Sequence, residues 1–171
     1  MSLVAISGNA SGTGTLTIAA PNTNSDFTLT LPQTTATLGI NGSAFSAYAG
    51  SATSLTGSAF TKVLFDTEEF DTNSNFASSR FTPTVAGYYQ INGHVSVNGG
   101  AQLVNAIFKN GSEYKRGTNI RVSSDGSSVA SIVYFNGSTD YVEIYCFAST
   151  TINTNTGIAL VYFNGSMVRA A

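Results

Sequence analysis

The sequence predicts an all-β protein, and its composition carries that prediction. Charged residues make up only 9% of the 171 residues, whereas a typical soluble domain has roughly 25%. Their place is taken by 22 Ser, 22 Thr, 15 Asn and 17 Gly, which are typical of strand faces and turns. Long helices need Glu, Lys, Arg, Gln and Leu on their exposed sides, and this chain has few of them.

The same composition argues against several classes of function. A net charge of -2 and a pI near 5.1 disfavour nucleic acid, which needs a basic surface. We expect no membrane partner, because no apolar run approaches the ~20 residues of a membrane helix, and no signal peptide, because residues 1–6 contain no basic residue. One cysteine and one histidine leave little from which to build a zinc site or a nucleophile–base pair, so no enzyme is expected.

Residues 1–40 differ from the rest of the chain, and we call them the arm. Apolar and threonine residues alternate at 15–19 and again at 27–31, which predicts a two-stranded ribbon with one apolar face. Such a ribbon is barely stable alone, so its apolar side chains should attach to a surface outside the arm. These side chains are Leu16, Ile18, Phe27, Leu29 and Leu31.

Residues 41–60 are rich in Gly, Ser and Ala, and we interpret them as a connector that runs into the first strand of a head at 61–171. Further strands are expected at 63–65, 88–97, 102–109, 114–122, 129–135, 141–148 and 156–168. The Asn-Gly or Asp-Gly pairs that begin at Asn98, Asn110, Asp125 and Asn136 fall between strands and predict hairpins. Those at Asn92 and Asn164 fall inside strands and predict bulges. The spacing favours an antiparallel sandwich or jelly roll.

Several of these strands are apolar on both faces. In the 141–148 strand one set of side chains can face the core, while a second set points the opposite way, interrupted only by Glu143. No helical segment is expected to cover that second face, so we expect another copy of the chain to do so, in a homotrimer around a three-fold axis. The alternative is that these aromatic side chains fill a large core within one chain. The predicted interface residues are Tyr134, Tyr141, Tyr145, Phe147 and Tyr162.

Between Phe65 and Ile91 the sequence has regularly spaced Phe residues, an Asp at 71 and a Gly-x-Tyr-x-apolar stretch at 87–91. In this pattern residues 44–171 resemble the C1q-like domain, a ten-stranded jelly roll of the C1q and tumour-necrosis-factor superfamily. The resemblance implies a jelly roll and a trimer. Two positions depart from the pattern, since Ile91 and Gly93 stand where aromatic residues are usual. The chain has no Gly-X-Y repeat, so the collagen stalk of many such proteins is absent. The matching signature positions are Phe65, Asp71, Phe76, Phe81, Gly87, Tyr89 and Gly165.

The arm is similar, at 26–32 and 35–39, to segments of tail-fibre and capsid-decoration proteins of tailed bacteriophages. This resemblance implies a structural virion protein on the capsid exterior: a trimeric decoration (cement) protein whose arm clamps the major capsid protein or another virion protein. The alternative is a tail-fibre tip that recognises a host-surface glycan or protein through loops near 98–100, 125–128 and 150–156. A cytokine-like or lectin-like binding module of a cell is a further alternative.

Other candidate sites have simpler explanations. Four carboxylates at Asp66, Glu68, Glu69 and Asp71 could bind Ca²⁺, but their spacing lacks the EF-hand glycine, and they could equally form a solvated loop; no other cofactor is expected. His94 is expected on a polar face and Cys146 in the core. The cations at Lys115, Arg116 and Arg121 form a small basic patch on a predicted hairpin, where such residues are usually solvated.

Overall fold

The computed structural model describes residues 11–13, 24, 42–122 and 125–171. The chain divides into two units, Met1–Ala36 and Thr37–Ala171, and the strands of the described residues lie in the second. Within the described ranges there is no helix, and hence none that could span a bilayer. The prediction of an all-β jelly roll is confirmed. The five predicted attachment residues of the arm lie outside the described residues.

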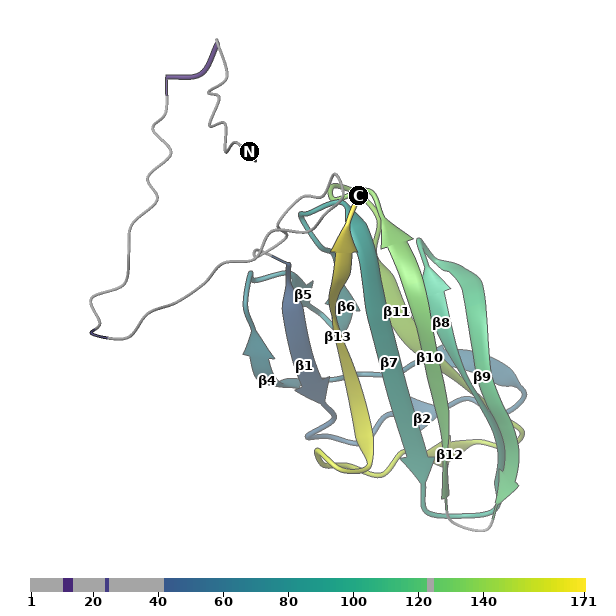
Figure 1. Ribbon diagram of the computed structural model, residues 1–171. Helices are drawn as coiled ribbons and strands as arrows, with labels where there is room; N and C mark the ends of the chain where they lie inside the picture. The colour runs from purple at the N-terminus through teal and green to yellow at the C-terminus, as the bar shows by residue number, and fades with distance from the viewer. Residues whose placement is uncertain (1–10, 14–23, 25–41, 123–124) are drawn as a thin grey trace. The chain divides into compact units, whose positions relative to one another are not determined.

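Two five-stranded antiparallel sheets pack face to face (Figure 1). The front sheet has the order β10 (Asp125–Phe135), β7 (Gly87–Val97), β13 (Val161–Ala170), β1 (Ala44–Tyr48) and β4 (Thr67–Asp71). The back sheet has the order β5 (Phe76–Ala77), β6 (Arg80–Phe81), β11 (Val142–Ala148), β8 (Ala101–Lys109) and β9 (Ser112–Val122). Beside β11 runs β3 (Ala59–Lys62), and the short strands β2 (Ser54–Leu55) and β12 (Ile152–Asn153) pair with each other.

Only one of the four predicted hairpins joins neighbouring strands of one sheet. At Asn110–Gly111 both residues have positive φ, 52° and 79°, and they connect β8 to its partner β9. The connections near Asn98, Asp125 and Asn136 instead lead from one sheet to the other, because β7 and β10 belong to the front sheet and β8, β9 and β11 to the back. A turn signal marks a reversal of the chain, but it does not say which sheet receives the next strand.

The predicted bulges at Asn92 and Asn164 are also wrong. These residues lie directly opposite each other in the regular pairing of β7 with β13, and the Asn92 Nδ2 donates to the Asn164 Oδ1 at 3.0 Å. The irregularity in β13 falls later, between Met167 and Arg169. A small polar residue with a short side chain can occupy a regular strand where its amide finds a partner across the sheet.

Aromatic side chains fill one half of the core. Phe45 of β1 stacks on Phe81 at 4.2 Å between ring centroids and on Phe76 at 5.1 Å. The signature aromatics Phe65, Phe76, Phe81 and Tyr89 are all buried, and the Asp71 Oδ2 accepts a hydrogen bond from the backbone N–H of Phe76 at 2.7 Å. The aromatic positions of the C1q-like signature are therefore residues that pack in the core.

Glycines allow close approach where the sequence departs from the usual aromatic pattern. A Cβ atom at Gly93 would lie 2.8 Å from the Ile144 Cδ1, so a branched side chain of the back sheet fills the space of the missing aromatic. At Gly165 a Cβ would lie 2.8 Å from the backbone oxygen of Gln90. A side chain at Gly93 would push the two sheets apart, and one at Gly165 would displace β13 from its neighbours β7 and β1 within the front sheet.

The head begins earlier than the connector interpretation implied. β1 is not a peripheral strand, because it lies between β13 and β4 inside the front sheet. Its Phe45 and Ala47 are buried in the core. Residues 41–60, which we interpreted mostly as a connector, therefore include an interior strand. The sequence did not predict this strand because the segment contains few large apolar residues.

The described chain enters and leaves the sandwich at the same end. Near Gly42, the Ser43 carbonyl accepts a hydrogen bond from the Met167 N–H, and Ala171 donates to the carbonyl of Ala86 (Figure 1). The opposite end, which we call the loop end, brings together Val97, Asp125 and Thr154 through backbone pairing.

Candidate functional site

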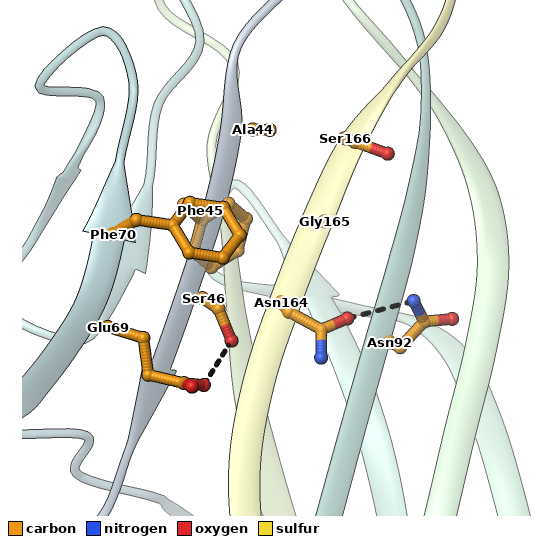
Figure 2. A pocket seen from close by; sticks show the side chains of 9 residues that line it. All are labelled: Ala44, Phe45, Ser46, Glu69, Phe70, Asn92, Asn164, Gly165 and Ser166. Atoms are coloured by element: carbon orange, nitrogen blue, oxygen red, sulfur yellow. Dashed lines mark hydrogen bonds between the residues drawn. The ribbon is translucent and has the colours of Figure 1, made fainter.

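The outward side of the front sheet, which we call the front face, has few charged side chains on four of its five strands; the edge strand β4 carries Glu68, Glu69 and Asp71. In the described strands β1, β13, β7 and β10, charge occurs only at Asp125, which opens β10, and at Arg169 near the end of β13. Its centre is a row of uncharged polar groups. Figure 2 shows the bonded amides of Asn92 and Asn164, with Ser46 donating to the Glu69 Oε2 of β4 at 2.7 Å.

Large apolar side chains are exposed on this face toward the end where the described chain enters. The exposed fractions are 45% for Tyr88, 53% for Ile132, 42% for Tyr134 and 58% for Val168. The Tyr88 and Tyr134 rings lie 5.4 Å apart. A hollow of about 570 Å³ is lined by Tyr88, Ile132, Val168 and the last three residues. Apolar groups gathered on one open sheet face are typical of a protein–protein contact.

A second hollow lies at the β4 side of the front face. It has a volume of about 350 Å³ and is lined in part by Ala44, Ser46, Glu69 and Phe70 (Figure 2). Phe70 is 51% exposed. The front face thus combines apolar side chains at two places with neutral amides between them.

Toward the loop end the front face carries aromatic and polar rings. His94 of β7 stacks on Tyr162 at 5.5 Å, and its Nδ1 shares a hydrogen bond with the Ser128 hydroxyl at 2.8 Å. His94 lies on the polar side of its strand, as the alternation predicts. These contacts give it a structural role, and we assign it no catalytic one.

The back sheet is aromatic on its outward side too, but there the same chain supplies the cover. Tyr145 stacks on Phe108 at 4.1 Å, and Phe147 packs against Phe60 of β3 at 5.8 Å. The Arg80 guanidinium lies 3.8 Å from the centre of the Tyr141 ring. All of these tyrosine and phenylalanine side chains are half-buried within one chain.

The structure therefore divides the predicted interface. Tyr134 and Tyr162 lie on the front face, whereas Tyr141, Tyr145 and Phe147 lie on the opposite side of the sandwich. One flat contact cannot include both sets. Two exposed residues of the front face were not predicted from the sequence. Ile132 could have been found, because it alternates with Tyr134 along β10. Val168 could not, because the register shift between Met167 and Arg169 interrupts the alternation of inward and outward side chains in β13.

Glu143 interrupts the outward aromatics of β11, and it is only 3% exposed. Its Oε1 accepts hydrogen bonds from the Lys62 Nζ at 2.7 Å and from the Arg80 Nε at 2.9 Å. Burial alone would raise the pKa of this carboxyl, but the bonds from Lys62 and Arg80 outweigh burial and hold it below its ordinary value. The carboxylate is therefore ionised at neutral pH.

The four candidate calcium ligands do not converge. The Asp66 Oδ1 accepts from the Gly50 N–H at 2.5 Å, Glu69 accepts from Ser46, and Asp71 accepts from Phe76. Among the described residues no three His, Cys, Asp or Glu side chains lie close enough to hold a metal. The hydrogen bonds made by three of these carboxylates instead tie loops and strands together.

The other candidates have ordinary structural surroundings. Cys146 is buried, and burial raises the pKa of its thiol to about 12, so the reactive thiolate is scarce. In the basic patch, Arg116 donates two hydrogen bonds to the Glu113 carboxylate, and Arg121 donates to the Gln102 Oε1 at 3.4 Å.

Comparison with known proteins supports the fold. No protein-family profile matches the sequence, and no curated protein matches it. Solved structures do match: the globular domain of zebrafish complement 1qA protein has a TM-score of 0.58 at 19% identity, covering 77% of this chain and all of that one. Murine APRIL gives 0.57 at 11% identity, with 75% and 100% coverage. Eiger TNF from S. frugiperda gives 0.52 at 6%, with 76% and 93% coverage. The head is a jelly roll of the C1q and tumour-necrosis-factor type.

Proposed function

We propose that this chain is a homotrimeric, non-enzymatic head that assembles through its front face and is attached to a virion by its arm. The observation that carries the proposal is the front face itself: four strands with charge only near their ends, exposing Tyr88, Ile132, Tyr134 and Val168. Interface centres are depleted of charge and enriched in aromatic residues. The likeness of the head to C1q and TNF jelly rolls favours three copies.

The polar centre of the front face is compatible with burial. Asn92 donates to Asn164 and accepts from Gln90, so a partner would cover bonded amides rather than isolated ones, which lowers the cost of desolvation. The back face has no comparable uncharged area, because Lys62, Arg80 and Glu143 lie within it. We therefore place the proposed three-fold axis where the front faces of the three subunits meet.

The virion role depends on the arm. Its resemblance to phage tail-fibre and capsid-decoration segments supports a decoration protein. Its expected apolar stripe could add strands to exposed sheet edges of a capsid, the mode of extended-peptide recognition that uses main-chain hydrogen bonds. Three arms on one trimer would also act together and raise the overall affinity.

A tail-fibre tip is the second candidate, and one structural observation favours it. The loops expected to contact a host surface come together at the loop end, where Val97 pairs with Asp125 and Thr154. The described chain enters the head near Gly42, at the opposite end (Figure 1). The loops are therefore placed away from the entry point, as a distal recognition tip requires.

Light scattering tests the assembly. We expect a mass of three 17.7-kDa chains, and a monomer at micromolar concentration would overturn the proposal. Deletion of residues 2–38 should leave a folded trimer that no longer attaches to its particle. Attachment without the arm would contradict the virion role as stated. Copy number separates the two candidates, since decoration requires hundreds per particle and a fibre tip only a few.

A further inference from the structure

We infer that a cationic hollow at the β5–β6 edge of the back sheet binds the oxyanion group of an acidic saccharide. The hollow has a volume of about 490 Å³ and is lined by Lys62, Ser74, Asn75, Ala77, Ser78, Arg80, Thr82 and Thr84. It lies in each subunit, so the inference goes beyond the proposed function and does not require the trimer.

The two cations at the hollow are held in place by one buried carboxylate. Glu143 binds Lys62 and Arg80 through its Oε1, so two positive charges share a single negative one. Lys62 uses a second N–H to reach the Ser78 carbonyl at 2.9 Å. The Arg80 side chain remains 43% exposed. One positive charge is thus left uncompensated at the surface of the hollow, which favours an anion.

Arg80 is preorganised for that role. Its guanidinium stacks 3.8 Å from the Tyr141 ring centre and bonds Glu143 through Nε and Nη2. In the described part of the chain, its Nη1 has no partner. A planar guanidinium fixed on two sides can direct its remaining N–H groups at a carboxylate, sulfate or phosphate oxygen. Little conformational entropy would be lost on binding.

The wall of the hollow is rigid and polar. Ser74, Ser78 and Ser79 have φ values of 53°, 52° and 57°, a left-handed conformation that non-glycine residues adopt at a cost. The Ser79 hydroxyl secures this segment by donating to the Phe65 carbonyl and accepting from its N–H at 2.8 Å. Strained backbone held by specific contacts is typical of binding sites.

The lining favours a saccharide over an acidic peptide. The hydroxyls of Ser74, Ser78, Thr82 and Thr84 make no hydrogen bonds within the described residues, and they can exchange bonds with sugar hydroxyls. The one apolar side chain among the lining residues is Ala77, whereas peptide contacts depend on apolar and aromatic anchors. The volume lies in the range of small-ligand sites.

The test is a titration of the full-length protein followed by saturation-transfer NMR. The probes are N-acetylneuraminic acid, galactose 6-sulfate, galactose 6-phosphate, neutral galactose, inorganic sulfate and a short polyglutamate peptide. We expect at least one acidic sugar to bind at least tenfold more tightly than galactose and than inorganic sulfate; the three acidic sugars distinguish carboxylate, sulfate and phosphate. Equal binding of galactose, equal binding of inorganic sulfate (an adventitious ion only) or tighter binding of the peptide would overturn the inference.

A charge-matched variant tests the site. Arg80→Gln/Glu143→Gln removes one cation together with its buried carboxylate and so keeps the net charge of the hollow. It should weaken the acidic sugar at least tenfold, whereas Lys115→Gln, on β9 outside the hollow, should change affinity less than twofold. If the double variant unfolds, Thr84→Trp, which obstructs the hollow from an exposed position without adding charge, should produce the same loss. Unchanged affinity in a folded variant of either kind would overturn the inference. Light scattering measures the oligomeric state of the same variants, so a failure of the trimer can be distinguished from a failure of the binding site.

Discussion

The aromatic side chains on the two outward faces of this sandwich differ in how far the same chain covers them. On the back face, Tyr141 and Phe60 are accompanied by guanidinium groups of the same chain, with Arg80 at 3.8 Å and Arg116 at 5.4 Å from the ring centres. On the front face, Tyr88 and Tyr134 contact each other at 5.4 Å and stay more than 40% exposed, although the Lys109 Nζ lies 5.9 Å from the centre of the Tyr134 ring. The back face is completed within one chain, and the front face is not.

The distribution of charge follows the same division. Six of the seven cations lie on β3 or the back sheet, and only Arg169 lies on the front sheet. Nearly all the cations of this chain therefore lie on the back side of the sandwich, where they can contact water or an anionic ligand. The difference teaches that exposed aromatics alone do not identify an interface; those of the front face are distinguished by their exposure and by the scarcity of charged residues on β1, β13, β7 and β10.

The largest expected effect comes from charging the front face. Ile132→Glu should convert the trimer to a folded monomer at micromolar concentration, because three carboxylates would be buried without partners. The matched variant Tyr114→Glu changes a side chain of similar exposure on β9 and should remain trimeric. Light scattering measures both masses, and a trimeric Ile132→Glu would place the contact elsewhere.

The next effect concerns the buried ion pair of the back face. Glu143→Ala should lower the free energy of unfolding by about 1–3 kcal/mol, because Lys62 and Arg80, whose side chains are 26% and 43% exposed, lose the buried carboxylate that they share. The control, Glu113→Ala, removes an exposed pair with Arg116 and should cost under about 1 kcal/mol. Urea unfolding compares the two, and equal losses would mean that burial of Glu143 adds nothing.

Much of the fold could be predicted from the sequence. Strand alternation correctly separates the core side chains Tyr89 and Ile91 from Gln90 and Asn92, and it places Cys146 in the core. The all-β class followed from composition. β1 was missed as an interior strand because its small residues, apart from Phe45 and Tyr48, resemble a linker; its burial comes from β4, from the Phe76 and Phe81 rings and from the distant β13, and none of these contacts is local in the chain.

The candidate site was predicted only in part. Alternation shows that Tyr134 and Tyr145 both point away from the core, but it does not show that they lie on different sheets. That assignment depends on connections that cross the sandwich, and the turn signals at Asn98 and Asn136 look the same for a hairpin and for a crossing. The cover that Phe60 gives to Phe147 is likewise a long-range contact with no local signal.

A smaller effect distinguishes the faces by pH. Because the folded-state pKa of Glu143 lies below its ordinary value of 4.5, its stabilising contribution is fully present above about pH 4.5 and is lost as the pH falls through the folded-state pKa. In the Ile132→Glu monomer, added Glu143→Gln should reduce the loss of stability between pH 7 and pH 3. Added Asn164→Ala on the front face should leave that loss unchanged, since amides do not titrate. Urea midpoints across this range provide the measurement, and parallel curves for all three proteins would contradict the role given to Glu143.

The smallest expected effect is that of the central amide pair, and it depends on assembly. In the Ile132→Glu monomer, Asn164→Ala should lower the free energy of unfolding by under about 1 kcal/mol, because water can replace the 3.0-Å bond to Asn92. In the trimer the same change would leave the Asn92 Nδ2 buried without an acceptor, while its Oδ1 keeps the bond from Gln90, at a cost of about 1–3 kcal/mol per subunit. Comparing the two backgrounds in a double-mutant cycle isolates that coupling. Equal losses in both would mean that the amides remain in contact with water, and that the front faces do not meet at their centre.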